Sequence, residues 1–498
     1  MFSVETSFPG KGRELAADRG LHSVLAEGNP DGPLFVLEDR EVTRREFARH
    51  VESVAGELLR RGVRHGDRVA VLGRTGYEWA LIDFAALAIG AVVVPVYPTS
   101  SAHQIEHVVT DSGAVWFFAE TPEDAERFGV ENVWLFTGLD GWRAAPGREF
   151  AECREVRADD LATIVYTSGT TGLPKGCMLT HANMYASSAN TVLRVEPMFE
   201  GSTILALPLS HVFGRTILLA CVIGRTRTRL VPGVPELLGE LAGFQPTFLA
   251  LVPYALEKIR KLGLNSFGAL TDVICGGASL DDTTAEYYAG LGVRILNCYG
   301  LTEAATAVTV NAPSTNRPGT VGRPIPGTTV GIAEDGEVLV AGPNVSPGYW
   351  PNRAKEQDWL YTGDLGHLDA DGYLTITGRR KEILVTNGGK NVAPAPLEDR
   401  IRLHPLVSNC MVLGDGRSYI TALITVDTDL PHDDPVLLKE IQSAVDSANE
   451  LVSRAESIRK FRVVHGDFTI ADGLLTPSMK LRRAAIGAAY AEDIAALY

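Results

Sequence analysis

The sequence lacks several features that would place it in a specialised class of protein. Its six cysteines are scattered, with no CxxC pair and no histidine close by, so the sequence indicates neither a zinc site nor a disulfide framework and favours core thiols in a reducing compartment. The N-terminus has no apolar segment with a small-residue cleavage site. The most apolar uncharged run, residues 84–97, falls short of the roughly 20 residues that span a bilayer. We therefore expect a cytoplasmic protein with no transmembrane segment.

Positive charge is also scarce. A net charge of -15 and a pI near 5.3 argue against nucleic acid or an anionic membrane as a partner and favour small substrates. With 45% hydrophobic and 21% charged residues the composition is that of a globular protein, and 50 glycines indicate many tight turns. A chain of 498 residues exceeds what one hydrophobic core usually supports, which predicts two or more domains.

Strand-like and helix-like patterns alternate along most of the chain. Thr43 and Glu46 form a capping-box pattern before a helical face that Gly62 ends. Apolar strand-like runs, separated by helix-length segments, occupy residues 67–73, 91–97, 114–120, 161–167, 204–208, 247–253, 272–277 and 293–298. This alternation is typical of parallel strands with crossover helices. We expect an α/β protein with a large N-terminal domain of parallel or mixed sheets, residues 1–380, and a small, mobile α+β domain, residues 381–498.

One loop carries the features of a phosphate site. The stretch IVYTSGTTGLPKGCMLTH, residues 164–181, leaves an apolar strand and enters a run of hydroxyls and glycines with one lysine. Its spacing does not match the Walker motif GxxxxGK[ST]. Hydroxyl and backbone donors with a lysine countercharge still favour triphosphate binding over a plain glycine-rich turn. The residues concerned are Thr167, Ser168, Gly169, Thr170, Thr171, Gly172 and Lys175.

Further polar residues follow later strands. Tyr299, Thr302 and Glu303 come directly after an apolar strand, where open parallel sheets bind ligands. Glu303 could hold Mg²⁺ or be a turn carboxylate facing water. Asp364 in YTGDLG and Arg379 in TGRRKEI could both reach ribose hydroxyls, although each alone would also suit a surface turn.

Seven ordered motifs give the chain a resemblance to a known superfamily. They are YTSGTTGLPKG, LPLSHVFGR, CGGASL, NCYGLTE, YTGDLG, GRRKEILVTNGGKNVAP and LTPSMKLRR. Their order resembles the adenylate-forming superfamily of acyl-CoA synthetases, nonribosomal adenylation domains and beetle luciferase, and their wording is most similar to long-chain fatty acyl-CoA synthetases. The resemblance implies a two-step reaction with ATP, Mg²⁺ and CoA. A carboxylate attacks the α-phosphate to give an acyl-adenylate and pyrophosphate, and a thiol then displaces AMP.

The resemblance also implies roles for residues around ATP. Phosphoryl transfer of this kind needs mainly positioning and charge neutralisation. The resemblance implies that Thr167 to Lys175 bind the β- and γ-phosphates, that Thr302 contacts the α-phosphate and that Glu303 binds Mg²⁺. It implies that Tyr299 and the backbone from Gly276 to Ala278, which includes Gly277, lie beside adenine. Asp364, with Arg379, would bind the ribose.

Residues of the tail, and one histidine, receive roles from the same resemblance. Lys480 would bridge the carboxylate and α-phosphate oxygens, unless it is a surface lysine beside Arg482 and Arg483. Lys381 would be the hinge, and Gly388 and Gly389 would line a thiol tunnel after the tail swings. His211 would close over the incoming carboxylate, although a histidine beside Val212 and Phe213 also suits a core position.

Two departures from the superfamily narrow the substrate. The run Phe213, Gly214, Arg215, Thr216 lacks the aspartate that pairs with a substrate ammonium in amino-acid-activating domains, which argues against an α-amino acid. Only about a dozen residues separate LVPYALEKIR from the GGA strand, where long-chain synthetases carry a long insertion. Phe213, Cys298 and residues 247–253 predict an apolar acid pocket, and so an uncharged aliphatic, aryl or polycyclic acid.

Other functions remain open on the sequence. An acyl carrier protein could replace CoA as the acceptor, but no extra segment typical of such ligases is evident. A P-loop NTPase is disfavoured by the Walker spacing. A non-catalytic nucleotide-binding homologue would not need Glu303, Asp364 and Lys480 together, and luciferase-like oxidation would use the same scaffold.

Overall fold

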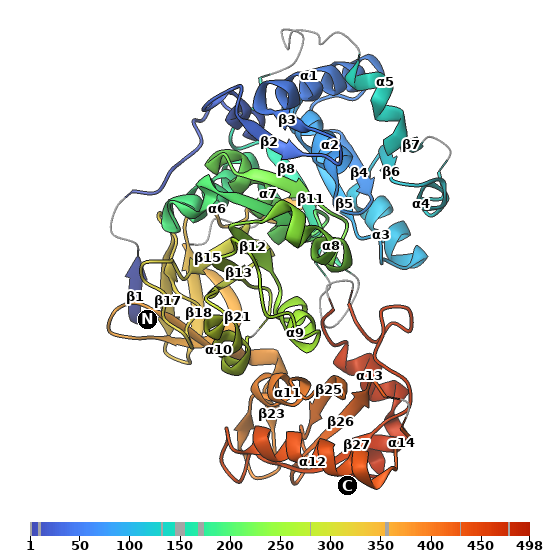
Figure 1. Cartoon of the computed structure of the whole chain (residues 1–498), viewed down its shortest axis with the longest axis vertical. Helices are drawn as coiled ribbons and strands as arrows, with labels where there is room; N and C mark the ends of the chain where they lie inside the picture. The colour runs from blue at the N-terminus through green and yellow to red at the C-terminus, as the bar shows by residue number, and fades with distance from the viewer. Residues whose placement is uncertain are drawn as a thin grey trace.

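The computed structural model describes residues 2–7, 11–130, 133–144, 155–167, 174–278, 280–353, 358–428, 430–476 and 479–498 (Figure 1). Three sheets with their helices form the larger part, and the last 120 or so residues form a smaller body beneath it, orange to red in the figure. This α/β organisation confirms the expected fold class.

The first sheet holds the strands on both sides of the predicted phosphate loop. Its strands within the described ranges are, in spatial order, β20 (Asn352–Arg353), β19 (Gly348–Tyr349), β9 (Lys175–Thr180), β8 (Leu161–Thr167), β5 (Val92–Val96), β4 (Arg68–Leu72), β6 (Trp116–Ala119) and β7 (Val133–Leu135). Strands β8, β5, β4, β6 and β7 run parallel, whereas β9 folds back antiparallel with Lys175 opposite Thr167. This hairpin fixes the two ends of the loop.

Among the residues that the structure describes, the second sheet has nine strands and a parallel centre. In order they are β16 (Arg323–Pro324), β15 (Thr306–Val310), β14 (Arg294–Leu301), β13 (Asp272–Cys275), β12 (Phe248–Leu251), β10 (Ser202–Leu205), β11 (Arg227–Leu230), β2 (Pro33–Val36) and β3 (Glu41–Thr43). Strands β14 through β2 are parallel, and β15, β16 and β3 are antiparallel additions at the edges. The sheet is therefore mixed, as the sequence predicted.

Helices between these sheets form the main core. The large part contains α1 (Arg44–Arg60), α2 (Tyr77–Ala88), α3 (Ala102–Ser112), α4 (Pro122–Glu126), α5 (Leu139–Arg143), α6 (His181–Arg194), α7 (Val212–Gly224), α8 (Val234–Phe244), α9 (Pro253–Lys261) and α10 (Asp282–Gly290). Helices α2 and α7 are buried along almost their whole length, as expected for apolar helices with no solvent face. The main apolar cluster joins them to strands of both sheets.

The predicted start of α1 is confirmed. The Thr43 side chain accepts a hydrogen bond from the backbone N–H of Glu46, which satisfies one of the donors that every helix leaves free at its first turn. The Glu46 carboxylate does not return to the cap as a full capping box would, because it pairs with Arg40.

A third sheet carries the residues predicted to bind ribose. Its order is β1 (Phe2–Ser7), β17 (Thr329–Ala333), β18 (Glu337–Ala341), β21 (Leu360–Leu368) and β22 (Leu374–Arg379). Antiparallel pairing of β21 with β22 sets Asp364 directly opposite Arg379. Strand β1, from the first residues of the chain, forms one edge of this sheet, a pairing that the sequence patterns did not reveal.

The tail is an α+β unit, as predicted. It contains the hairpin β23 (Leu384–Val385) and β24 (Asn391–Val392), the sheet β25 (Val407–Leu413), β26 (Ile420–Val426) and β27 (Ile458–Val463), and the helices α11 (Pro394–Arg402), α12 (Pro435–Asn449), α13 (Arg483–Ala489) and α14 (Ala491–Ala495). Its apolar side chains form their own clusters.

Two expectations about the whole chain can be compared with the structure. Within the described ranges, no helix is both long and apolar enough to cross a membrane. Cys177, Cys221, Cys275 and Cys410 are buried free thiols, and Cys298 is partly buried. Cys153 lies outside the described residues.

Candidate active site

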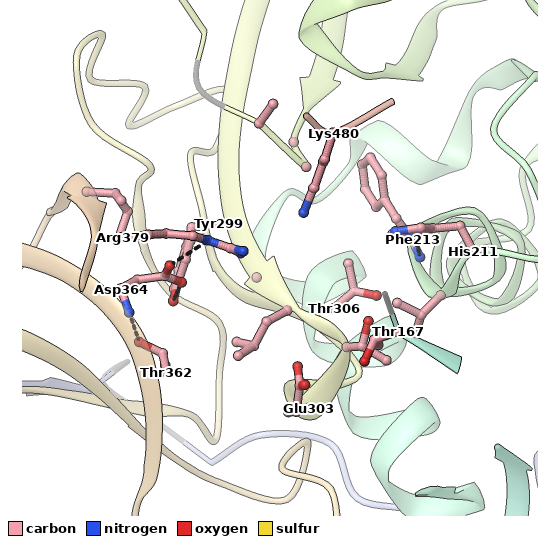
Figure 2. A pocket seen from close by; sticks show the side chains of 18 of the residues that line it. Thr167, His211, Phe213, Tyr299, Glu303, Thr306, Thr362, Asp364, Arg379 and Lys480 are labelled. Carbon is pink, nitrogen blue, oxygen red and sulfur yellow. Dashed lines mark hydrogen bonds and ion pairs between the residues drawn. The ribbon is translucent and has the colours of Figure 1, made fainter. Parts of the chain in front are cut away.

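A cleft of about 3660 Å³ separates the large part from the tail and collects most of the predicted site residues (Figure 2). Its walls include the ends of β8 and β14, the start of α7, the β21–β22 pair and the segment around Lys480. Elements far apart in the sequence therefore meet around one space.

Asp364 is a carboxylate of this cleft that two side chains hold in place. It is buried, and its two oxygens accept a hydrogen bond from the Tyr299 hydroxyl at 2.7 Å and pair with Arg379 Nε at 3.0 Å (Figure 2). Its backbone N–H donates to Thr362 Oγ1 at 3.1 Å. The strand register and these bonds fix a carboxylate beside a guanidinium, an arrangement suited to a pair of vicinal hydroxyls.

Tyr299 bonds Asp364 of the Asp364–Arg379 pair and also belongs to the predicted adenine site. Burial, and then the charge of Asp364, raise the pKa of Tyr299 well above its usual value, so its hydroxyl stays a donor at neutral pH. The backbone part of that site begins at Gly276, where a Cβ would lie 2.5 Å from Cys298 Sγ, and continues at Gly277 with φ +90°. Gly277 and Ala278 are exposed and line the cleft, as Tyr299 does.

Thr302 and Glu303 lie in a 3₁₀ turn directly after β14. Both line the cleft, and Glu303 Oε1 accepts a hydrogen bond from the Tyr349 hydroxyl. No donor among the described residues bonds Oε2. Thr302 and Glu303 thus present a hydroxyl and a carboxylate oxygen to the same space.

Only the base of the predicted phosphate loop can be placed. Thr167 and Lys175 face the cleft at the ends of β8 and β9, and the Lys175 ammonium lies 5.9 Å from the centre of the Tyr349 ring. Ser168, Gly169, Thr170, Thr171 and Gly172 lie outside the described residues. Their role remains a prediction.

His211 stands at the N-terminus of α7 and faces the cleft. Its Nδ1 accepts a hydrogen bond from the backbone N–H of Phe213 at 3.0 Å, so the proton of the neutral ring lies on Nε2. Burial, and then the charge of Lys480, lower the pKa of His211 to about 4. At neutral pH the ring is therefore an uncharged donor through Nε2.

The wall beyond His211 is apolar. Phe213, Ile217, Cys298, Ala307 and Val310 line it, and Thr216 and Thr306 add hydroxyls. Arg215 points away from the cleft into the core, where it pairs with Asp83. The expectation that residues 247–253 line this pocket is wrong, because β12 is buried in the middle of its sheet and forms no part of the wall.

Lys480 reaches the cleft from the tail. Figure 2 shows its side chain pointing between Arg379 on one side and His211 and Phe213 on the other. The residue keeps contact with solvent inside the cleft, yet the surrounding walls desolvate its ammonium and, together with repulsion from Arg379, lower its pKa. The position suits a cation that meets an anion brought in by a ligand.

The other tail residues with predicted roles separate into two groups. Lys381 is exposed in a 3₁₀ turn (Arg380–Glu382) between the two parts and borders the cleft. Gly388 and Gly389 lie at the exposed tip of the β23–β24 hairpin and do not border the cleft. This structure does not bring them to the site, and their tunnel role stays a prediction.

Sequence reasoning missed several residues that hold the site together. Tyr349 bonds Glu303, and Thr362 bonds the backbone of Asp364. The Glu337 carboxylate accepts a hydrogen bond from the Gly363 N–H at 2.8 Å and pairs with Arg380 at 3.1 Å. The one sequence signal for these residues was Tyr349, a tyrosine in the glycine- and proline-containing stretch GPNVSPGYW.

The donor set fits Mg²⁺ bound together with a nucleoside triphosphate. Within the described part of the chain, no group of three histidine, cysteine or carboxylate side chains could hold a metal. A hard cation at Glu303 would therefore take most of its ligands from phosphate oxygens and water, which is the usual mode for Mg²⁺. The hydroxyls around the cleft, together with Lys175 and Lys480, complement the remaining phosphate charge.

Family comparisons agree with this geometry. The model of the AMP-binding enzyme family matches residues 24–350, and that of the AMP-binding enzyme C-terminal domain matches residues 381–498. The long-chain-fatty-acid–CoA ligase FadD15 of Mycobacterium bovis is 37% identical over 583 aligned residues, covering 96% of each chain. The feruloyl-CoA synthase of an Amycolatopsis species is 30% identical over 75% of this chain and 80% of that protein.

Solved structures share the fold at lower identity. O-succinylbenzoate coenzyme A synthetase (MenE) from Bacillus subtilis, in complex with ATP and magnesium ion, has a TM-score of 0.79 at 24% identity and covers 95% of this chain and 99% of that one. The anthranilate CoA ligase AuaEII, in complex with anthranoyl-AMP, has a TM-score of 0.83 at 22% identity over 95% of this chain and 98% of its own. By its family matches and its relatives, the chain belongs to the AMP-binding enzymes of the adenylate-forming superfamily and is an AMP-forming acid–CoA ligase.

Proposed function

We propose that the protein activates an uncharged hydrophobic carboxylic acid with ATP and then transfers the acyl group to the thiol of CoA. In the first step a carboxylate oxygen attacks the α-phosphorus, and pyrophosphate leaves with the electrons of the broken P–O bond. In the second step the thiolate attacks the acyl carbon, and AMP leaves. The observation that carries the proposal is the meeting of Lys480, Glu303 and the Asp364–Arg379 pair around one cleft.

The residues divide the first step between them. Asp364 and Arg379 hold the ribose, and Thr302 contacts the α-phosphate. The ammonium of Lys480 neutralises the oxygens of the carboxylate and the α-phosphate as they approach each other. The neutral His211 donates from Nε2 towards the carboxylate without adding a charge. Mg²⁺ bound at Glu303 would neutralise phosphate charge and favour departure of pyrophosphate.

The apolar wall supports the choice of substrate class. A charged or α-amino acid would have to be desolvated against Phe213, Ile217, Cys298 and Val310, a cost that nothing in the run 213–216 offsets. Relatives named for a fatty acid and for ferulate agree with an uncharged hydrophobic acid. The 583-residue alignment exceeds the length of this chain, so FadD15 contains segments that this chain lacks. The acyl chain length that this protein accepts therefore need not match that of FadD15.

ATP–pyrophosphate exchange over a panel of hydrophobic acids tests the proposal. Each acid is assayed with and without CoA, and the nucleotide products are identified by mass. We expect acid-dependent exchange, with AMP and an acyl-CoA accumulating when CoA is added. Exchange without acyl-CoA would indicate a carrier-protein acceptor, ADP as the product would indicate a different phosphoryl transfer, and no exchange with any acid would contradict the proposal.

A further inference from the structure

The segment that carries Thr302 and Glu303 continues into an unusual backbone conformation. Ala305 has φ +48° and Thr306 has φ +87°, although neither is glycine and threonine is β-branched. Such conformations persist only where the surrounding structure determines them, and they are concentrated at functional sites. The question is which groups hold this backbone in place.

Asn344 is the side chain that holds both ends of the unusual stretch. It is completely buried, and its Nδ2 donates to the carbonyl of Ala304 at 3.3 Å and to that of Ala307 at 2.9 Å. These two carbonyls flank the two residues with positive φ. The Asn344 Oδ1 accepts from Thr328 Oγ1 at 3.0 Å, which fixes the orientation of the amide.

The loop that contains Asn344 is itself held on both sides. On one side, Asn183 of α6 donates through Nδ2 to the carbonyls of Pro343 and Val345, each at 2.8 Å. On the other, the N–H of Ser346 donates to the carbonyl of Glu303 at 2.8 Å. A continuous set of bonds therefore runs from a buried helix to the turn that presents Glu303.

The turn has little room to relax in another way. A Cβ at Gly300 would lie 1.3 Å from the carbonyl oxygen of Thr306, so β14 and β15 leave no room for a side chain between them at this position. Thr216 of α7 also donates to the carbonyl of Ala305 at 3.2 Å. If the Asn344 bonds were lost, the backbone that would shift is that of the turn itself, which contains Glu303.

On the basis of the proposed function, we infer that Asn344 is a positioning residue for the Mg²⁺ carboxylate. Asn344 does not border the cleft, whereas Val345 and Ser346 beside it do. It therefore touches neither nucleotide nor acid, and it acts by setting the backbone that aims Glu303 and Thr302. Partners of this kind, one shell behind a metal ligand, typically change metal affinity by about 10–100-fold when removed.

Three variants separate positioning from simple stability. Asn344→Asp keeps the shape and the acceptor for Thr328 but replaces both amide donor bonds with an oxygen facing two carbonyls. Thr328→Val keeps the amide and removes the hydroxyl that orients it. The matched control is Asn190→Asp, since Asn190 is equally buried on α6 and, among the described residues, its side chain bonds only the N–H and carbonyl of Arg13.

Two readouts are measured for each variant well below its Tm. One is the Mg²⁺ concentration that half-saturates ATP–pyrophosphate exchange. The other is the ratio of ATP dissociation constants without and with Mg²⁺, measured by calorimetry in the absence of acid. For Asn344→Asp we expect the first to rise, and the second to fall, by roughly tenfold or more. Asn190→Asp should lower Tm by a similar amount and leave both readouts unchanged.

Each result decides the inference. Unchanged Mg²⁺ readouts in Asn344→Asp, whatever its Tm, would overturn it, as would an equal shift in Asn190→Asp. If Asn344→Asp does not fold, Thr328→Val decides, with a smaller shift in the same direction expected and no shift counting against the inference. A wild-type protein without acid-dependent exchange would contradict the proposed function instead, and the calorimetric ratio alone would then test Asn344.

Discussion

The two sides of the cleft are built in different ways. On the side formed by the large part, the two predicted ligand carboxylates are held by side chains from other elements: Asp364 by Tyr299 and Arg379, and Glu303 by Tyr349. On the tail side, Lys480 belongs to a turn closed by local bonds, from its own N–H to Thr476 Oγ1 and from the Thr476 N–H to its carbonyl. Its ammonium has no hydrogen-bond partner among the described residues.

The contacts between the two parts are correspondingly light. Arg260 and Lys261, at the end of α9, donate to the carbonyls of Leu403 and Val407 at 3.1 Å. Arg400 of α11 bonds Thr283 Oγ1 at 2.5 Å and lies 3.6 Å from Asp281. Site residues fixed in the large part, and a lysine on a tail that can move away, suit a reaction in which Lys480 is needed for one step only. The predictions below test this difference.

Replacing Lys480 should have the largest effect, and on one step. Lys480→Ala should lower acyl-adenylate formation by roughly 10²–10³-fold, because the approaching anions lose their countercharge. Thioester formation from a supplied acyl-adenylate should stay largely intact. Single-turnover assays of each half-reaction measure both. Lys439→Ala, an exposed lysine of α12, is the control. An equal loss in both steps would contradict a role for Lys480 in one step only.

Replacing Asp364 should instead affect both steps. Asp364→Asn removes the charge that pairs with Arg379 and weakens the acceptor for Tyr299, and acyl-adenylate carries the same ribose as ATP. We expect KM for ATP and the dissociation constant of the acyl-adenylate each to rise about 10–100-fold. Asp371→Asn serves as the control, because Asp371 is also paired with an arginine, Arg317, and neither residue has an assigned role in the site. A defect confined to adenylation would show that Asp364 does not hold the ribose.

Contacts between the two parts should shift the balance of the steps by a smaller factor. Arg400→Ala and Lys261→Ala each remove a polar contact worth about 0.5–1.5 kcal/mol, which corresponds to roughly 2–10-fold. Adenylation should slow by this factor, and the thioester step should be unchanged or faster. The control is Lys258→Ala. Lys258 is an exposed cation on α9, the helix of Lys261, and among the described residues it makes no bond to the tail. A slower thioester step in either variant would mean that these contacts serve both states.

The last expected effect concerns the pH dependence of stability. His211 has a folded pKa of about 4, below its value near 6.5 in an unfolded chain. Between these values the unfolded state binds the proton first, so His211 reduces stability progressively as pH falls from about 6.5 to about 4.

Replacement of His211 tests this sign directly. The stability of His211→Asn relative to the wild type should therefore increase as pH falls from 7 to 5, measured by urea unfolding. Adenylation rates of the wild type should show no titration of His211 between pH 5 and 8. A relative stability that is constant with pH would place His211 in a more polar setting, and the exposed His103→Asn is the control.

Local patterns predicted much of the fold, and ordered motifs predicted the charged site residues. The α1 start at Thr43, the alternating strands and the α+β tail all follow from periodicity within short windows. Glu303, Asp364 and Lys480 were found because each sits in a recognisable motif. Their convergence on one cleft agrees with the roles assigned, which stay predictions until the variants above are measured.

The residues that were missed depend on long-range contacts. Asn344 in a loop and Tyr349 in the two-residue strand β19 are neutral residues, and their partners lie about 40 residues away in sequence. Strand β1 pairs with β17 more than 300 residues later. Gly388 and Gly389 were predicted from a motif, but this arrangement of the tail leaves their loop away from the cleft. No local pattern reports such pairings or the position of one body against another.

The pairing of β1 with β17 also has a consequence during synthesis. At about 5–20 residues per second, the ribosome needs on the order of 20–60 s between making residues 2–7 and making their partner strand. Throughout that time the N-terminal strand has no partner strand to join, although the strands of the first sheet as far as β9 are made within it. The sheet that carries Asp364 can close only after residue 379, so the ribose side of the cleft is among the last parts of the large body to form.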